Sequence, residues 1–154
     1  MISQTAEYAL RAIVFLAENP ESGQTTEQIA KATQIPAPYL SKVLQLLARA
    51  SLVQSQRGLG GGFSLKIKPK KLTVLEVVNA VDPIKRILEC PLGLDAHANK
   101  LCSLHRRLDE ASALVERAFG ATTIEDLLAD PTGGNVYTFP FLKIEEQTST
   151  RKPS

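Results

Sequence analysis

Both cysteines and both histidines of the chain lie in one short stretch, "ECPLGLDAHANKLCSLH", residues 89 to 105. Thiolate sulfur and imidazole nitrogen are ligands for zinc and for iron-sulfur centres, and two thiols can also form a disulfide. The loop alone therefore leaves four interpretations open: a zinc site, an iron-sulfur site, a disulfide and no site at all.

Enzymatic chemistry is not indicated by these residues. Cys102 and His105 are three residues apart on one helical face, but the sequence offers no orienting acid, oxyanion site or substrate cleft beside them. The run "GLGGG" at residues 58 to 62 is not followed by Gly-Lys-Ser/Thr and does not complete a dinucleotide fingerprint. We therefore expect neither catalysis nor nucleotide binding.

Composition favours a cytoplasmic globular protein. The 154 residues, 44% of them apolar, suffice for one domain or one small domain with an extension. The most apolar early run, residues 8 to 17, is too short to span a bilayer and is interrupted by Arg11. We therefore expect no membrane partner. Two cysteines are also too few for a disulfide scaffold, so we do not expect secretion.

Positive charge is concentrated in one part of the chain. Residues 28 to 71 contain eight Lys or Arg and no Asp or Glu, although the net charge is only +2. A charge run is often only a solvated face, but the absence of acids over this whole segment favours a surface that binds a polyanion.

The elements that carry this charge follow the order of a winged helix-turn-helix. Apolar spacing predicts a helix over residues 3 to 18, a short one capped by Thr25 with Gln28, and a third that starts near Pro38. The third helix has a buried stripe, formed by Leu40, Val43, Leu44 and Leu47. Two β-like stretches, Val53 to Gln56 and Phe63 to Ile67, then flank the glycine-rich turn of a predicted hairpin wing.

Such a fold would contact DNA with the start of its third helix and with its wing. The helix presents hydrogen-bonding side chains, and glycines let the wing approach a groove closely while Arg57 reaches into it. The expected DNA-binding residues are Thr25, Ala37, Tyr39, Ser41, Lys42, Gln45, Arg57 and Gly60. A winged helix that binds protein instead stays open as an alternative.

A long helix is predicted from Asn99 to Phe119. Its apolar residues alternate steps of three and four, the spacing of a coiled-coil seam: Leu101, Leu104, Leu108, Ala111, Val115 and Ala118. We therefore predict a homodimer through residues 101 to 118. The expected fold is mainly α with a small β-hairpin wing, divided into a DNA-binding domain (1–71), a cluster loop with the dimerisation helix (72–130) and a C-terminal tail (131–154).

The sequence resembles the IscR/NsrR-type family of winged-helix transcription repressors. The resemblance is carried by "EYALRAIVFLA", "IPAPYLSKVLQLLARASLV", "RGLGGGFSL", "LTVLEVVNAVD" and "CSLHRRL", and covers about residues 1 to 130. It implies a dimer that crosses its long helices and binds a double-stranded DNA operator. In many members an iron-sulfur cluster, held in the loop before that helix, controls DNA binding in response to redox state, nitric oxide or iron-sulfur status.

The resemblance also implies a set of cluster ligands. The family's first and third cysteines match Cys90 and Cys102, and a ligating histidine matches His105, whereas the second cysteine falls on Ala96. A carboxylate supplied by the partner subunit in one branch matches Glu7. Two thiolates with two harder ligands favour a [2Fe-2S] cluster.

Three questions about this set stay open. Asp95 and His97 flank the position of the missing cysteine and are alternative ligands. A thiol or disulfide switch of Cys90 and Cys102 without metal is a second interpretation, and cysteines with only a structural role are a third.

Overall fold

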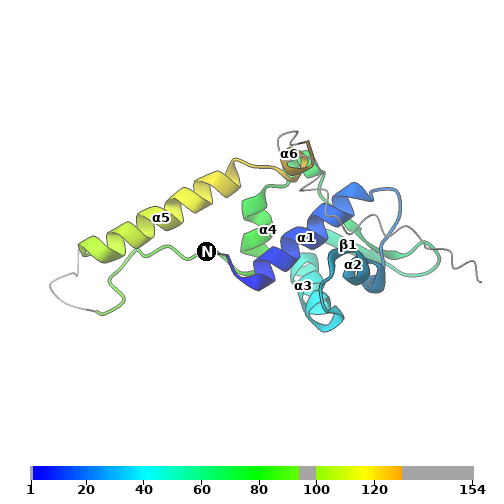
Figure 1. Ribbon diagram of the computed structural model, residues 1–154, viewed down its shortest axis with the longest axis horizontal. Helices are drawn as coiled ribbons and strands as arrows, with labels where there is room; N and C mark the ends of the chain where they lie inside the picture. The colour runs from blue at the N-terminus through cyan, green and yellow to red at the C-terminus, as the bar shows by residue number, and fades with distance from the viewer. Residues whose placement is uncertain (1, 94–99, 130–154) are drawn as a thin grey trace, which may run out of the picture.

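The computed structural model describes residues 2–93 and 100–129. Its elements are α1 (Gln4–Glu18), α2 (Thr26–Thr33), α3 (Ala37–Arg49), β1 (Val53–Gln56), β2 (Gly62–Leu65), the 3₁₀ helix η1 (Pro69–Lys71), α4 (Val74–Val81), α5 (Ser103–Gly120) and α6 (Ile124–Ala129). Figure 1 shows α1 to α4 gathered around a common core, with α5 extending from them as an arm. The fold is mainly helical with a two-stranded hairpin wing, as predicted.

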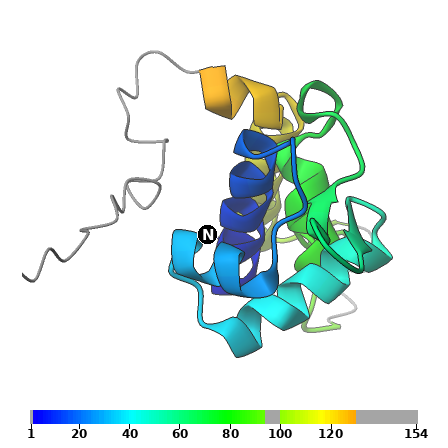
Figure 2. The ribbon, with the colours of Figure 1, turned by 90° about the vertical axis from the view of Figure 1, so that its right-hand side faces the viewer.

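Helix α1 is the centre of the bundle. The Ser3 hydroxyl caps it by accepting from the Ala6 N–H at 3.2 Å. Its buried residues combine small alanines with large apolar side chains: Ala6, Ala9, Ala12, Ile13, Val14, Phe15 and Leu16. Small residues allow neighbouring helices to approach closely, and α1 packs against α2, α3, α4 and α6. Figure 2 shows α3 near one end of α1 and α6 near the other.

The helix-turn-helix is formed by α2 and α3. The predicted capping box is confirmed, because the Thr25 hydroxyl accepts from the Gln28 N–H and the Gln28 side chain accepts from the Thr25 N–H. Gln34 takes a left-handed backbone (φ +56) that ends α2, and buried Ile35 anchors the turn to the core. Helix α3 then buries the predicted stripe of Leu40, Val43, Leu44 and Leu47.

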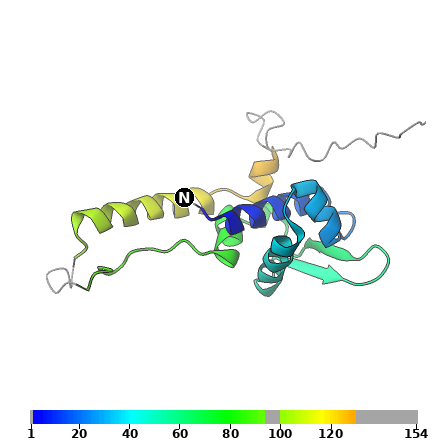
Figure 3. The same ribbon diagram turned by 60° about the horizontal axis from the view of Figure 1, so that its bottom comes forward.

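The wing is an antiparallel hairpin in which Val53 pairs with Leu65 and Gln56 with Gly62. The first strand has its predicted bounds, but the second is Gly62–Leu65, where Phe63 to Ile67 was expected. The Lys66 N–H still donates to the carbonyl of Leu52, the residue opposite it in the register of the hairpin, so the pairing ends one residue beyond β2. Figure 3 shows the hairpin extending from the bundle beside α3.

The C-terminal elements return to the same core. A capping box of Thr73 and Glu76 begins α4, which buries Val74, Val77 and Val78. The Val74 N–H donates to the Thr122 carbonyl at 2.9 Å, and the Ile124 N–H donates to the Leu72 carbonyl at 2.8 Å. These bonds hold α6 on the bundle, so one core contains residues from both sides of position 71.

The arm consists of α5 and the extended residues 82–93 that run alongside it (Figure 1). The helix begins at Ser103, not at Asn99, because Cys102 takes an extended backbone and acts as its N-cap. Leu101 therefore precedes the helix, whereas the other five predicted seam residues lie on it. Within residues 2–93 and 100–129, no helix has the length and apolarity needed to cross a bilayer.

Candidate DNA-binding face and cysteine site

The exposed side of α3 carries the residues predicted to contact DNA. Ala37, Tyr39, Ser41, Lys42 and Gln45 are all exposed, and the tyrosine is exposed to 58%. They lie in the first three turns of the helix, opposite the buried leucine stripe. The face can therefore reach base edges and phosphates without unpacking the core.

The wing is fixed at its root. The Gln24 and Phe63 backbones exchange two hydrogen bonds, of 2.8 and 2.7 Å, which tie β2 to the segment before α2. Gly62 (φ +133) permits this approach, since a Cβ there would lie 2.5 Å from the Gln24 backbone. Arg57 and Gly60 lie beyond the root, exposed near the tip, and Thr25 is exposed at the start of α2.

The positive charge of residues 28–71 faces solvent. All eight basic side chains are exposed, namely Lys31, Lys42, Arg49, Arg57, Lys66, Lys68, Lys70 and Lys71. None of them forms an ion pair with any residue that the structure describes. Their charge is thus available to neutralise phosphates.

Cys102 and His105 are brought together at the outer end of the arm. The Cys102 sulfur lies 3.2 Å from His105 Nδ1, and both residues are half-buried. The pair forms because the N-cap and the third residue of a helix lie on the same side of its first turn. Both atoms can therefore approach one metal ion.

Cys90 is half-buried and opens a turn in the extended segment of residues 82–93, which runs alongside α5. The Gly93 N–H donates to the Cys90 carbonyl at 3.1 Å, and Gly93 has φ +60. The alternative ligands Asp95 and His97, like Ala96, lie outside the described residues. Among those described, no group of three or more His, Cys, Asp and Glu is close enough to bind one metal ion.

Glu7 is not near the cysteines of its own chain. It lies in the first turn of α1, near the base of the arm, whereas α5 begins at the arm's outer end (Figure 1). Its Oε1 accepts from Arg11 Nε at 3.1 Å and from Arg11 Nη2. Arg11 Nη1 also donates to the Thr33 carbonyl at the end of α2, at 3.4 Å. Glu7 and Cys102 can therefore share a metal site only if they come from two different chains.

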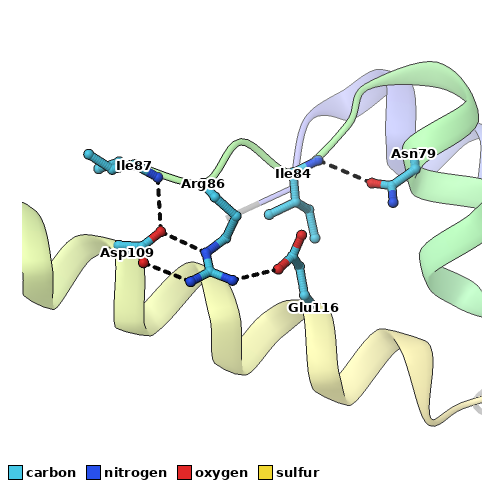
Figure 4. Close-up of polar contacts among 6 residues, drawn as sticks. All are labelled: Asn79, Ile84, Arg86, Ile87, Asp109 and Glu116. Atoms are coloured by element: carbon cyan, nitrogen blue, oxygen red, sulfur yellow. Dashed lines mark hydrogen bonds and ion pairs between the residues drawn. The ribbon is translucent and has the colours of Figure 1, made fainter. Parts of the chain in front are cut away.

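An ion cluster that the sequence did not reveal joins the extended segment of the arm, residues 82–93, to α5 (Figure 4). Arg86 donates to both carboxylate oxygens of Asp109, at 2.6 and 2.7 Å, and to Glu116 at 3.1 Å. The Ile87 N–H also donates to Asp109, at 2.9 Å. The bonds from Arg86 lower the pKa of Asp109 to about 2, and the two acids raise the pKa of Arg86. No local sequence motif signals this contact, because its partners are 23 and 30 residues apart.

Helix α5 leaves most of its predicted seam uncovered, although Leu101 and Val115 are half-buried. Leu104 and Leu108 are 62% and 48% exposed, and Ala111 and Ala118 are exposed as well. Asp109 and Ala113, by contrast, face the rest of the chain. Leu114, outside the predicted seam, is exposed to 60% and widens the apolar face.

Comparison with known proteins identifies the family. Residues 2–130 match the Rrf2 family, described as iron-dependent transcriptional regulators. The chain is 31% identical over 135 residues to the transcriptional regulator NsrR of Geobacillus kaustophilus, covering 84% of this chain and 90% of that protein.

Solved structures share the fold. CymR, the global cysteine regulator of Bacillus subtilis, aligns with a TM-score of 0.69 at 24% identity, over 82% of this chain and 95% of that one. IscR of T. potens aligns with a TM-score of 0.68 at 24% identity, over 83% and 85%. The matched family consists of regulators, which agrees with the expectation that the chain is not an enzyme. The chain belongs to the Rrf2 family of DNA-binding transcriptional regulators.

Proposed function

We propose that the protein is a homodimeric, sequence-specific regulator whose operator affinity is set by an iron-sulfur cluster at the outer end of the arm. A thiol and an imidazole lie 3.2 Å apart at the start of α5, the helix whose apolar face is exposed. Binding of a cluster there would thus affect the same helix that joins the two subunits.

A symmetric pairing of α5 helices would complete the donor set. Helix α5 has 18 residues, about 27 Å of length, and it runs from the arm's outer end back to the bundle. An antiparallel pair related by a two-fold axis would place the start of one α5 beside the end of the other. The Cys102–His105 pair of one chain would then approach the bundle of the second chain, on which Glu7 lies.

The donor set then consists of Cys90, Cys102 and His105 of one chain and Glu7 of the other. The bonds from Arg11 engage only Oε1 of Glu7, and its Oε2 has no bonded partner among the described residues. One carboxylate oxygen is thus available to a metal. Two thiolates and two harder ligands suit a [2Fe-2S] cluster, which would supply one-electron redox chemistry.

A thiol switch without metal is the second candidate. His105 Nδ1 lies 3.2 Å from the Cys102 sulfur, so the imidazole is in hydrogen-bonding contact with the thiol that would react. In this case Cys90 and Cys102 would form a disulfide on oxidation.

Anaerobic purification followed by visible absorption and iron and sulfide analysis separates the two candidates. We expect a visible chromophore in the wild-type protein. Cys90→Ala or Cys102→Ala should abolish it, because each supplies one of only two thiolates. His105→Ala should leave a labile or spectrally shifted cluster, since both thiolates remain. A colourless wild-type protein without iron or sulfide would refute the cluster.

Glu7→Ala tests the donor from the second chain. It should resemble His105→Ala if Glu7 ligates, and should leave the spectrum unchanged if Asp95 or His97 does. Glu27→Ala is the matched control, because Glu27 is an exposed acid in the first turn of α2, which lies away from the arm (Figure 1). A spectral change in the control equal to that of Glu7→Ala would show that loss of an acid, not of a ligand, is being measured.

A further inference from the structure

The tip of the wing carries a large apolar side chain that nothing covers. Leu59 is 108% exposed, the highest value among the exposed large hydrophobic residues of the described chain, and the next, Leu88, reaches 79%. It lies between Gly58 and Gly60, whose φ angles are +98 and +71. A leucine here adds nothing to the packing of the core and is open to contact with another molecule.

The backbone holds this side chain out as a narrow point. The Gly61 N–H donates to the Gly58 carbonyl at 2.9 Å and closes the turn around Leu59. Glycine suits positions 58 and 60 because both have a positive φ, which side chains rarely adopt. No other atom lies within 4 Å of where a Cβ would stand at either position, so the tip is open to solvent. The pairing of Gln24 with Phe63 fixes the root of the same hairpin. The result is one leucine on a slender, anchored tip.

The charges around the tip indicate what it contacts. Arg57 is exposed two residues away, and the whole segment of residues 28–71 lacks acids. The wing also extends beside α3, which carries the polar face described above (Figure 3). A cationic, narrow tip fits the minor groove of duplex DNA, where arginine is attracted to a narrow groove and leucine is one of the side chains that unstack base steps.

We propose that Leu59 enters the minor groove of the operator and wedges into a base step. The wing would then favour DNA sequences whose base steps unstack at low cost. The preferred step would be a flexible pyrimidine–purine step, because these unstack at the lowest cost. This inference rests on the proposed function, since it requires a specific operator. The contact of Leu59 would make binding depend on DNA deformability, in addition to the polar contacts made by α3.

The experiment uses the full-length protein and a duplex that the wild-type protein enriches from a randomised library. The adenine analogue 2-aminopurine, which brightens when unstacked, is placed in turn at each position flanking the enriched half-sites. Wild-type protein should raise its fluorescence at one position in each half-site. Leu59→Ala should lose that signal and bind about tenfold more weakly, or ~1.4 kcal/mol. The slope of affinity against salt should stay unchanged, because no charge is removed.

Two variants sharpen the result. Leu59→Met keeps an apolar side chain of similar volume and should retain the signal and most of the affinity. Leu88→Ala removes another exposed leucine, from the arm on the other side of the molecule from the wing, and should bind like wild type (Figure 1). Since Leu59 is fully exposed, its loss should leave the thermal unfolding midpoint unchanged.

The inference is overturned if Leu59→Ala binds the enriched duplex as tightly as wild type, or if wild-type protein brightens the probe at no position. It is also overturned if the substitution instead lowers the sedimenting mass of the DNA-free protein or its retention on phosphatidylglycerol vesicles, which would assign Leu59 to self-association or to a lipid surface. If wild-type protein enriches no sequence, the proposed function fails together with the inference.

Discussion

Substitution of Leu108 gives a quantitative test of the dimer seam on α5. Full burial of a leucine contributes about 1.5–3 kcal/mol, and Leu108 is 48% exposed in the single chain, so covering it contributes about 1 kcal/mol. In a symmetric dimer the contact occurs twice. Leu108→Ala should therefore weaken dimerisation by about 2 kcal/mol, a rise of about 30-fold in the dissociation constant. Leu108→Glu, which would place two carboxylates at the seam, should give monomer.

Sedimentation equilibrium over a range of protein concentrations measures this constant directly. Leu59→Ala is the matched control, because it removes an equally large exposed side chain from the wing and should leave the dimer intact. A dissociation constant for Leu108→Ala within about threefold of wild type would refute the predicted seam. If Leu114→Ala weakened the dimer while Leu108→Ala did not, the contact would lie on the neighbouring face of α5.

Three further predictions concern the arm and the DNA-binding face. Because Arg86 lowers the pKa of Asp109 to about 2, the bond stabilises the fold above pH 4, and that contribution is lost as the pH falls from about 4 to about 2. The thermal unfolding midpoint of wild type should fall over this range by more than that of Asp109→Asn, and equal falls would contradict the role of the bond. Lys42→Ala should reduce the log–log salt slope of DNA binding by about 0.9 if Lys42 contacts one phosphate, as measured by titration from 50 to 200 mM salt. Arg57→Ala should cost about 1–3 kcal/mol on the enriched operator and much less on random duplex, and equal losses on both would exclude a reading role.

The helices of the bundle follow from local rules that can be read in the sequence. The capping box of Thr25 and Gln28 and the stripe from Leu40 to Leu47 depend only on residues within a few turns of one another. The apolar spacing of α5 likewise predicted its exposed face, because that spacing fixes which side chains share a side of a helix. The placement of Cys102 beside His105 follows from the same geometry.

Contacts between distant segments could not be predicted in this way. The bond of Arg86 to Asp109 depends on how residues 82–93 run along α5, and the docking of α6 depends on backbone bonds between residues 72–74 and 122–124. The sequence predicts the start of α5 too early, at Asn99. Its N-cap is Cys102, which is not one of the usual capping residue types and makes no side-chain capping bond, so the sequence does not mark the boundary. The exposure of Leu59 could not be predicted from the sequence, since a leucine in a turn can as easily fold back onto the wing.

Control of DNA binding by the cysteine site can be measured as operator affinity in defined states of that site. Full-length protein purified anaerobically would be compared in its cluster-loaded form, oxidised and reduced, and in its cluster-free form, at matched dimer concentration on the enriched duplex. Because the arm carries both the cysteine site and the dimer helix, we expect the dissociation constants to differ by about tenfold or more between at least two states, or ~1.4 kcal/mol. Equal affinity in all three states would show that the cysteine site does not control DNA binding.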